Sequence, residues 1–186
     1  MMDHKYIYAS LTRISDLAEK GFEVRALPKD KWQTGDYVVY EILNEGGESL
    51  KIELPNGRMR GVIAGEHIVG ALGERYATLE ATGSWRNVTD DLKMTVLTGA
   101  GLFGKLTSKS MFIPKMIKII YKGHAVRDGK KLTMGDFVET IPKVQFNTPV
   151  ILFVGTSMSA GKTTSARIVT NIFKQAGYKV VGAKLT

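Results

Sequence analysis

The 186-residue sequence contains no cysteine, which excludes disulfides, thiolate zinc sites, iron–sulfur clusters and thiol nucleophiles. Its three histidines, His4, His67 and His124, are scattered without metal-ligand spacing, so a zinc site is not expected. The longest apolar run, residues 150–154, is far shorter than the ~20 residues that a membrane-spanning helix needs. No basic segment followed by an apolar stretch begins the chain. We therefore expect a cytoplasmic protein that does not enter the membrane.

Acidic residues are missing from one end of the chain. The sequence has 26 basic and 18 acidic residues, giving a formal net charge of +8. No aspartate or glutamate follows Glu139, whereas residues 140–186 contain six lysines and arginines. The excess positive charge therefore belongs mainly to the last quarter, and it does not by itself indicate a nucleic-acid partner.

The sequence up to about residue 145 consists of short strand-like segments separated by turns. Asn56-Gly57 and Asp128-Gly129 lie between such segments and are typical of tight hairpin turns. We expect one short helix at about 12–20 and little other helix. The expected strands cover residues 22–27, 37–43, 50–54, 58–64, 76–82, 94–98, 116–126 and 132–138. This pattern predicts a small antiparallel β-barrel or sandwich as an accessory domain over residues 1–145.

The pattern changes after a short linker at residues 143–149. An apolar run at 150–154 is followed by a loop of small residues, a helix expected at about 162–176 and a second apolar run at 179–183. Short apolar strands that flank a helix are typical of a βαβ unit with a parallel sheet. The fold class is thus α+β in two parts, with residues 146–186 forming the truncated βαβ start of a P-loop α/β domain.

The loop before this helix has the composition of a phosphate-binding loop. Gly161 allows close approach of the backbone, Lys162 can reach the β- and γ-phosphates, and the Thr163 hydroxyl can hold Mg²⁺. The predicted nucleotide-binding residues are Gly155, Thr156, Ser159, Ala160, Gly161, Lys162, Thr163 and Thr164. The pattern does not distinguish ATP from GTP.

The spacing of the glycines in this loop indicates which class of P-loop proteins the sequence resembles. Five residues separate Gly155 from Gly161, and the sequence Gly-Thr-x-x-x-x-Gly-Lys-Thr resembles dethiobiotin synthetase and the cobyrinic and cobyric acid synthases. These enzymes belong to the dimer-forming P-loop class that also contains the MinD and ParA ATPases. That branch has an extra lysine five residues before the loop lysine, where this sequence has Ser157. The absence of this lysine argues against a partitioning-type switch. The resemblance covers residues 149–186.

The resemblance implies specific roles and partners. It implies activation of a small acidic substrate by ATP and Mg²⁺, in a homodimer. It also implies that Lys184, together with Lys162, lies near the substrate and the phosphates as a catalytic residue.

Two observations limit the enzymatic interpretation. These proteins hold Mg²⁺ partly through an acid on a later strand, and no acid follows Glu139 here. Two strands and one helix are also too few to cover both faces of a sheet. We therefore expect the sequence to be the N-terminal portion of a longer protein, or the missing part to come from another chain, and we do not expect this chain alone to hydrolyse nucleotide.

An alternative function is a nucleotide-dependent regulator or carrier whose β-rich domain binds an anionic partner such as nucleic acid. Its basis is a lysine-rich segment, comprising Lys105, Lys109, Lys115, Lys118 and Lys122. The nearby Gly99–Gly104 sequence matches the GxGxxG pattern, but no acid follows about 20 residues later to bind a ribose. We expect a glycine-rich loop there rather than a dinucleotide site.

Overall fold

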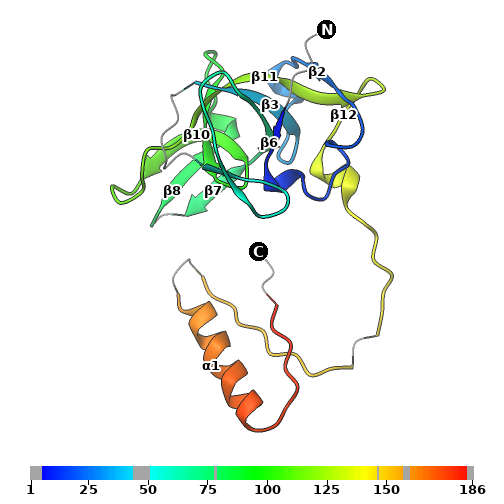
Figure 1. The fold of residues 1–186 in the computed structure, drawn as a ribbon, viewed down its shortest axis with the longest axis vertical. Helices are drawn as coiled ribbons and strands as arrows, with labels where there is room; N and C mark the ends of the chain where they lie inside the picture. Colours follow the sequence, from blue (N-terminus) through cyan, green and yellow to red (C-terminus); the bar gives the residue numbers. More distant parts are fainter. Residues whose placement is uncertain (1–5, 44–50, 78, 146, 157–159, 184–186) are drawn as a thin grey trace. The chain divides into compact units, whose positions relative to one another are not determined.

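The computed structural model describes residues 6–43, 51–77, 79–145, 147–156 and 160–183. The chain divides into two compact units, Met1–Thr140 and Ile141–Thr186. The first unit is built mostly of β-strands, and the second contains one α-helix (Figure 1). In the described part of the chain, no helix has the length and apolar character needed to cross a membrane.

The first unit consists of short strands and single-turn helices. The strands are β1 (Ile7–Tyr8), β2 (Glu23–Arg25), β3 (Tyr37–Ile42), β4 (Lys51–Glu53), β5 (Met59–Gly61), β6 (His67–Leu72), β7 (Glu74–Ala77), β8 (Ala81–Ser84), β9 (Lys93–Thr98), β10 (Leu102–Lys109), β11 (Lys118–Arg127) and β12 (Lys130–Lys131). The 3₁₀ helices are η1 (Ser10–Thr12), η2 (Lys29–Lys31), η3 (Trp85–Asn87) and η4 (Met134–Phe137).

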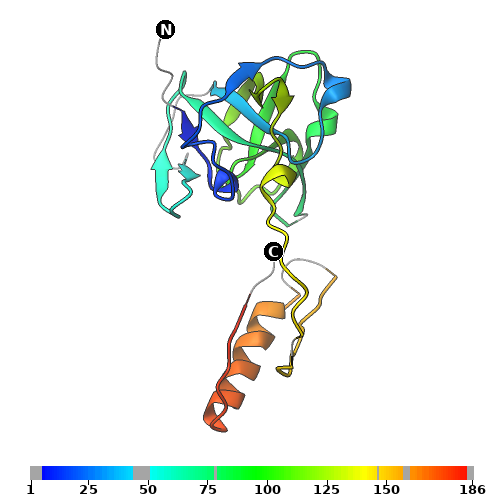
Figure 2. The same ribbon diagram turned by 90° about the vertical axis from the view of Figure 1, so that its right-hand side faces the viewer.

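The strands pair mostly antiparallel, and the pairing returns to its starting strand. β6 pairs with β3, β3 with β11, β11 with β9, and β9 with β10. β10 then pairs with β6 in parallel, so each of these five strands has a partner on both sides. The ribbon shows the strands gathered into one body in both views (Figures 1 and 2). A β-rich fold for this part of the chain is confirmed.

Strand β3 shows how the sequence builds the core. Successive side chains of a strand point to opposite faces, so its apolar residues divide between two clusters. Val38, Tyr40 and Ile42 pack into the larger cluster with Phe103 of β10. Tyr37 and Val39 pack into the smaller one. Both faces of β3 are therefore covered, which explains its almost continuous apolar sequence.

Both predicted hairpin turns are confirmed. Gly57 lies between the paired strands β4 and β5, with φ of 82°. Asp128 and Gly129 connect β11 to β12 with φ of 51° and 76°. Positive φ at both central residues is the geometry that Asp-Gly tolerates in a two-residue hairpin.

The helix predicted at residues 12–20 is wrong. The chain forms only η1, and turns follow it. The Thr12 hydroxyl donates to the Ala9 carbonyl at 2.9 Å, and the Ser15 hydroxyl donates to the Thr12 carbonyl at 2.7 Å. Such local bonds offer the backbone an alternative to the α-helix.

Two predicted strands are also wrong. Residues 76–82 turn back on themselves, because Tyr76 of β7 pairs antiparallel with Thr82 of β8. Residues 132–138 contain η4, whose start is stabilised by the Asp136 carboxylate. That carboxylate accepts hydrogen bonds from the backbone and the hydroxyl of Thr133, at 2.8 and 3.0 Å. This capping box ends the extended conformation at Thr133.

Strands β6 and β10 were absent from the prediction, although β6 is central to the sheet. Residues 68–72 are all buried, so β6 shows no alternation of apolar and polar residues. It also contains Gly70, where a Cβ would lie 2.3 Å from the Gly101 carbonyl oxygen. A glycine in a strand weakens the sequence signal but permits this close approach of two backbones. Residues 99–101 of the GxGxxG segment lie in a turn, as expected, but residues 102–104 lie in strand β10 and not in a loop.

The second unit contains helix α1 (Lys162–Gln175), which confirms the predicted helix. Gly177, with φ of 87°, ends the helix, and Tyr178 N donates to the Phe173 carbonyl at 3.0 Å. Residues 150–154 and 179–183 are not in strands, so the predicted βαβ pairing is not observed in this part of the structure. None of the described residues from 141 to 183 is buried, so the two apolar runs have no packed layer to form against.

Candidate functional site

The start of α1 positions the residues of the candidate phosphate loop. Gly161 lies immediately before the helix with φ of 80°, a left-handed conformation that glycine adopts without strain. Ser165 N donates to the Gly161 carbonyl at 2.9 Å, which closes the first turn. The N-terminus of an α-helix presents backbone N–H groups that can bind an anion. The first turn contains no acidic residue that would repel one.

The Lys162 side chain folds back over the beginning of the loop. A Cβ placed on Gly155 would lie 3.0 Å from both Cγ and Cδ of Lys162 and 3.2 Å from its Nζ. The ammonium therefore lies beside the Gly155 backbone, and Lys162 is half-buried. This contact joins the two ends of the candidate loop, seven positions apart in the sequence.

The remaining predicted residues lie on the same segment. Thr156 and Ala160 are exposed on the loop, and Thr163 and Thr164 are exposed in the first turn of α1. Exposure leaves the Thr163 hydroxyl accessible to a solvated cation. Ser159 and Lys184 lie outside the described residues, and so does Ser157.

The described residues contain no group of three histidine, aspartate or glutamate side chains arranged to hold a metal ion. The candidate cation ligand in the loop is the Thr163 hydroxyl. A Mg²⁺ ion keeps several waters and is commonly held by one or two protein ligands together with phosphate oxygens. One hydroxyl beside a phosphate-binding helix terminus is compatible with that mode of binding.

The lysine-rich segment on β10 and β11 is partly neutralised. Lys122 Nζ lies 2.8 Å from a Glu41 carboxylate oxygen, and Lys105 Nζ lies 3.6 Å from Asp91. Lys109 donates to the Ile113 carbonyl at 2.7 Å. These contacts reduce the positive field that an anionic partner would meet along this edge.

Sequence reasoning missed a buried polar network in the first unit. His124 and Asp36 are fully buried, and the His124 Nε2 and Asp36 Oδ2 atoms lie 3.1 Å apart. The two residues are 88 positions apart in the sequence. No short motif joins them, so only the pairing of the strands brings them together.

Comparison of the chain with protein-family models, curated proteins and solved structures finds no match.

Proposed function

We propose that residues 155–164 bind the phosphates of a nucleotide, ATP or GTP. The observation that carries this proposal is the Lys162 side chain, which folds back over Gly155 at the N-terminus of a 14-residue helix. A helix N-terminus, a left-handed glycine and a lysine that reaches back over the loop are the parts from which phosphate-binding loops are built.

Each part has a distinct role in this proposal. In this proposal, backbone N–H groups of the first turn donate to phosphate oxygens, and the positive end of the helix dipole favours the negative charge of the phosphates. Lys162 places a full positive charge beside the β- and γ-phosphates. Thr163 supplies its hydroxyl to Mg²⁺, which would neutralise phosphate charge when bound. Ser159 completes the loop in this proposal, and Lys184 would orient an acidic substrate.

We propose ATP-dependent activation of a small acidic substrate, as in synthetases, as the wider function of this nucleotide site. The resemblance of the loop supports this, and it also implies a homodimer of the kind that this class of proteins forms. The cyclic pairing of β6, β3, β11, β9 and β10 supports a small barrel as the accessory domain. A nucleotide-dependent regulator or carrier is the second candidate, because no aspartate or glutamate follows Glu139 in this sequence.

Isothermal titration of the full chain with ATP·Mg²⁺ tests the proposal. Replacement of Lys162 by alanine removes a charge-assisted contact, and we expect affinity to fall by roughly 10- to 100-fold. The Gly155→Ala variant should weaken binding less, because the added methyl group displaces only the flexible Lys162 side chain.

Matched controls are available in the same unit. Lys174 lies in the last turn of α1, so Lys174→Ala removes an equal charge from the opposite end of the helix. Gly182→Ala adds a methyl group where nothing lies within 4 Å. Both controls should bind like the unmodified chain. Equal affinity of Lys162→Ala and Lys174→Ala would contradict the proposal.

A further inference from the structure

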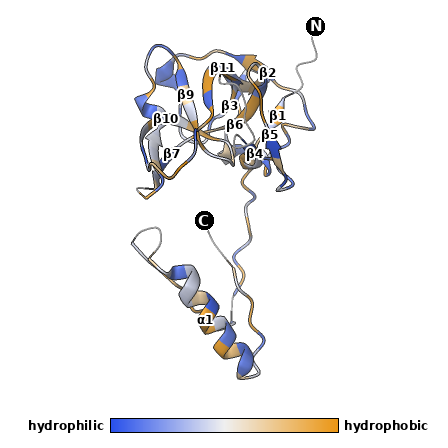
Figure 3. Cartoon of the chain, turned by 60° about the vertical axis from the view of Figure 1, so that its left-hand side comes forward, coloured by the Kyte–Doolittle hydropathy of each residue, from blue (hydrophilic) through white to orange (hydrophobic). Residues whose placement is uncertain are grey.

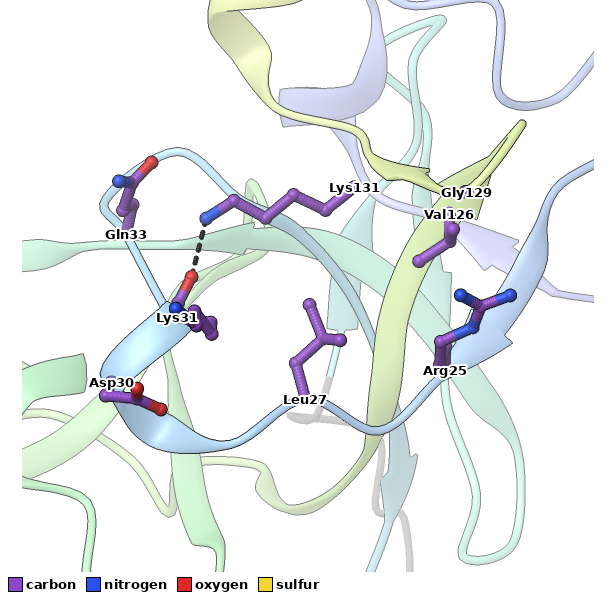
Figure 4. A pocket seen from close by; sticks show the side chains of 8 residues that line it. All are labelled: Arg25, Leu27, Asp30, Lys31, Gln33, Val126, Gly129 and Lys131. Atoms are coloured by element: carbon purple, nitrogen blue, oxygen red, sulfur yellow. Dashed lines mark hydrogen bonds between the residues drawn. The ribbon is translucent and has the colours of Figure 1, made fainter.

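A cavity of about 430 Å³ opens on the β-rich unit, bounded by η2 and the strands β2, β11 and β12 (Figure 4). Its volume lies within the usual range of small-molecule sites. Leu27 and Val126 supply apolar surface, and Arg25, Lys31 and Lys131 supply positive charge. The cavity belongs to a different unit from the phosphate loop, so it is a separate candidate site.

The wall of this cavity is held by a buried carboxylate. Asp36 Oδ2 accepts hydrogen bonds from Gln33 N at 2.7 Å, Lys131 Nζ at 2.8 Å and His124 Nε2 at 3.1 Å. Gln33 and Lys131 both line the cavity. Burial raises the pKa of Asp36, but these three hydrogen bonds outweigh burial, and the pKa lies below its ordinary value. The carboxylate is therefore charged at neutral pH and fixes two lining residues.

The same network holds a third lining residue, Leu27. His124 Nδ1 lies 2.5 Å from the Tyr121 hydroxyl, which also accepts a hydrogen bond from Leu27 N at 3.1 Å. Trp32 donates from Nε1 to the Leu27 carbonyl at 2.9 Å and packs against the Tyr121 ring. Burial raises the pKa of Tyr121 to about 12, so its hydroxyl stays protonated. Both backbone groups of Leu27 are thus tied to the network.

Stability alone is a weak explanation for this network. Burying an ionic group costs several kcal/mol, and replacing buried ionic clusters with apolar residues is often neutral or stabilising. The network instead connects the cavity residues Leu27, Gln33 and Lys131, which come from separate segments of the chain. A wall fixed before binding lowers the entropic cost of holding a ligand.

The lysines of the lining offer hydrogen-bond donors to an anionic ligand. The Lys131 side chain extends toward η2, and its ammonium donates to the Lys31 carbonyl at 2.7 Å (Figure 4). Its charge is matched by Asp36, and Arg25 pairs with Glu23 at 2.9 Å on the exposed side. Lys31 has no ion-pair partner in the described structure. The lining itself holds three cations and one carboxylate, Asp30.

We propose that this cavity binds a small organic anion, whose carboxylate or phosphate group is received by Lys31 and Lys131 and whose apolar body lies over Leu27. The Lys131 ammonium has a third N–H available beyond its bonds to Asp36 and Lys31. The ligand would exchange water for charge-assisted hydrogen bonds at one end and for apolar contact at the other.

Titration calorimetry of the full-length Lys162→Ala chain tests this proposal, because that background removes the phosphate-loop lysine. Hexanoate and phenyl phosphate are the probes, and hexanol is the uncharged control. We expect one or both anions to bind and hexanol to bind at least tenfold more weakly. The stronger of the two anions identifies the head group.

Variants of the cavity provide the decisive comparison. Lys31→Gln keeps the network intact and should weaken binding of the anion by roughly fivefold to tenfold. Arg25→Gln should weaken binding less, because Arg25 pairs with Glu23 and lies across the cavity from Lys131 (Figure 4). The matched control is Lys130→Gln, since Lys130 is adjacent to Lys131 but pairs with Asp136 at 2.8 Å. Absence of binding by both anions, equal binding of hexanol, or equal affinity in all three variants would overturn the proposal. None of these results depends on nucleotide binding.

Discussion

At the scale of single residues, Asp36 is the most constrained group in the β-rich unit. Its side chain is fully buried, and one oxygen, Oδ2, receives all three hydrogen bonds. The other oxygen, Oδ1, is buried without a hydrogen-bond partner in the described structure. Such a group is costly to bury and depends strongly on its donors. The sequence indicates none of this, because Asp36 lies in a turn-like segment of ordinary composition.

The lowered pKa of Asp36 predicts how stability depends on pH. A carboxyl whose pKa is lower in the folded than in the unfolded state contributes stability that is fully present above the unfolded value of about 3.9. This contribution is lost as the pH falls further, through the folded value. The Asp36→Asn variant should therefore lose roughly 3 kcal/mol of unfolding free energy at pH 7, and the deficit should shrink below about pH 4.

Urea unfolding at pH 7, 5, 4 and 3 measures this difference directly. Asp136 is the control, since its pKa is also lowered, first by its hydrogen bond to Lys130, but it lies near the surface. Asp136→Asn should cost much less at every pH, because surface ion pairs contribute little. A pH-independent deficit for Asp36→Asn would show that the carboxylate is not stabilised as we infer.

At the scale of elements, the structure separates features that are encoded locally from those that are encoded by tertiary packing. Helix α1 was predictable, because its apolar spacing and the final Gly177 are local signals. The two hairpin turns were predictable for the same reason. Strand β6 was not, because burial on both faces removed the alternation that marks a strand. The strand predicted at residues 132–138 was wrong, because Thr133 and Asp136 cap a 3₁₀ turn within an apolar segment.

The contact of β6 with the β9–β10 turn predicts a sharp dependence on side-chain size. A Cβ on Gly70 would lie 2.3 Å from the Gly101 carbonyl oxygen and 2.7 Å from Phe103 Cζ. Because the nearer atom belongs to the backbone, the clash cannot be relieved by a rotamer change. We expect Gly70→Ala to lower the unfolding free energy by about 1–3 kcal/mol, measured by urea denaturation.

A strand glycine without neighbours serves as the control for this substitution. Gly61 lies in β5, and nothing approaches the position of its Cβ within 4 Å. Gly61→Ala should therefore change stability by less than about 0.5 kcal/mol. Equal effects of the two substitutions would mean that β6 and the β9–β10 turn do not approach as closely as described.

At the scale of the whole molecule, the two units differ in how far each is stabilised by apolar packing within itself. The β-rich unit buries two apolar clusters, which include Tyr40, Phe103 and Val39. In the second unit Ile168 and Ile172 of α1 are more than half exposed, and the helix carries apolar and polar residues along its length (Figure 3). A single 14-residue helix gains little stability without tertiary packing.

The candidate sites follow the same division. The candidate phosphate loop could be proposed from the sequence, because the chemistry of Gly161, Lys162 and Thr163 lies within three consecutive residues. The proposed anion cavity could not, because Leu27, Gln33 and Lys131 meet only through the network around Asp36 and His124. A loop motif is a local property of the chain, whereas a cavity between strands depends on the complete fold.

The most direct test of the nucleotide-binding proposal is an amide NMR titration of the full chain with ATP·Mg²⁺. The proposal predicts that the largest chemical-shift changes occur at Gly161, Lys162, Thr163 and Thr164, the amides at the start of α1, and that Lys162→Ala needs roughly 10- to 100-fold more nucleotide to reach the same changes. Saturating nucleotide that leaves these four amides unchanged, or the same midpoint of the titration in Lys162→Ala, would contradict it.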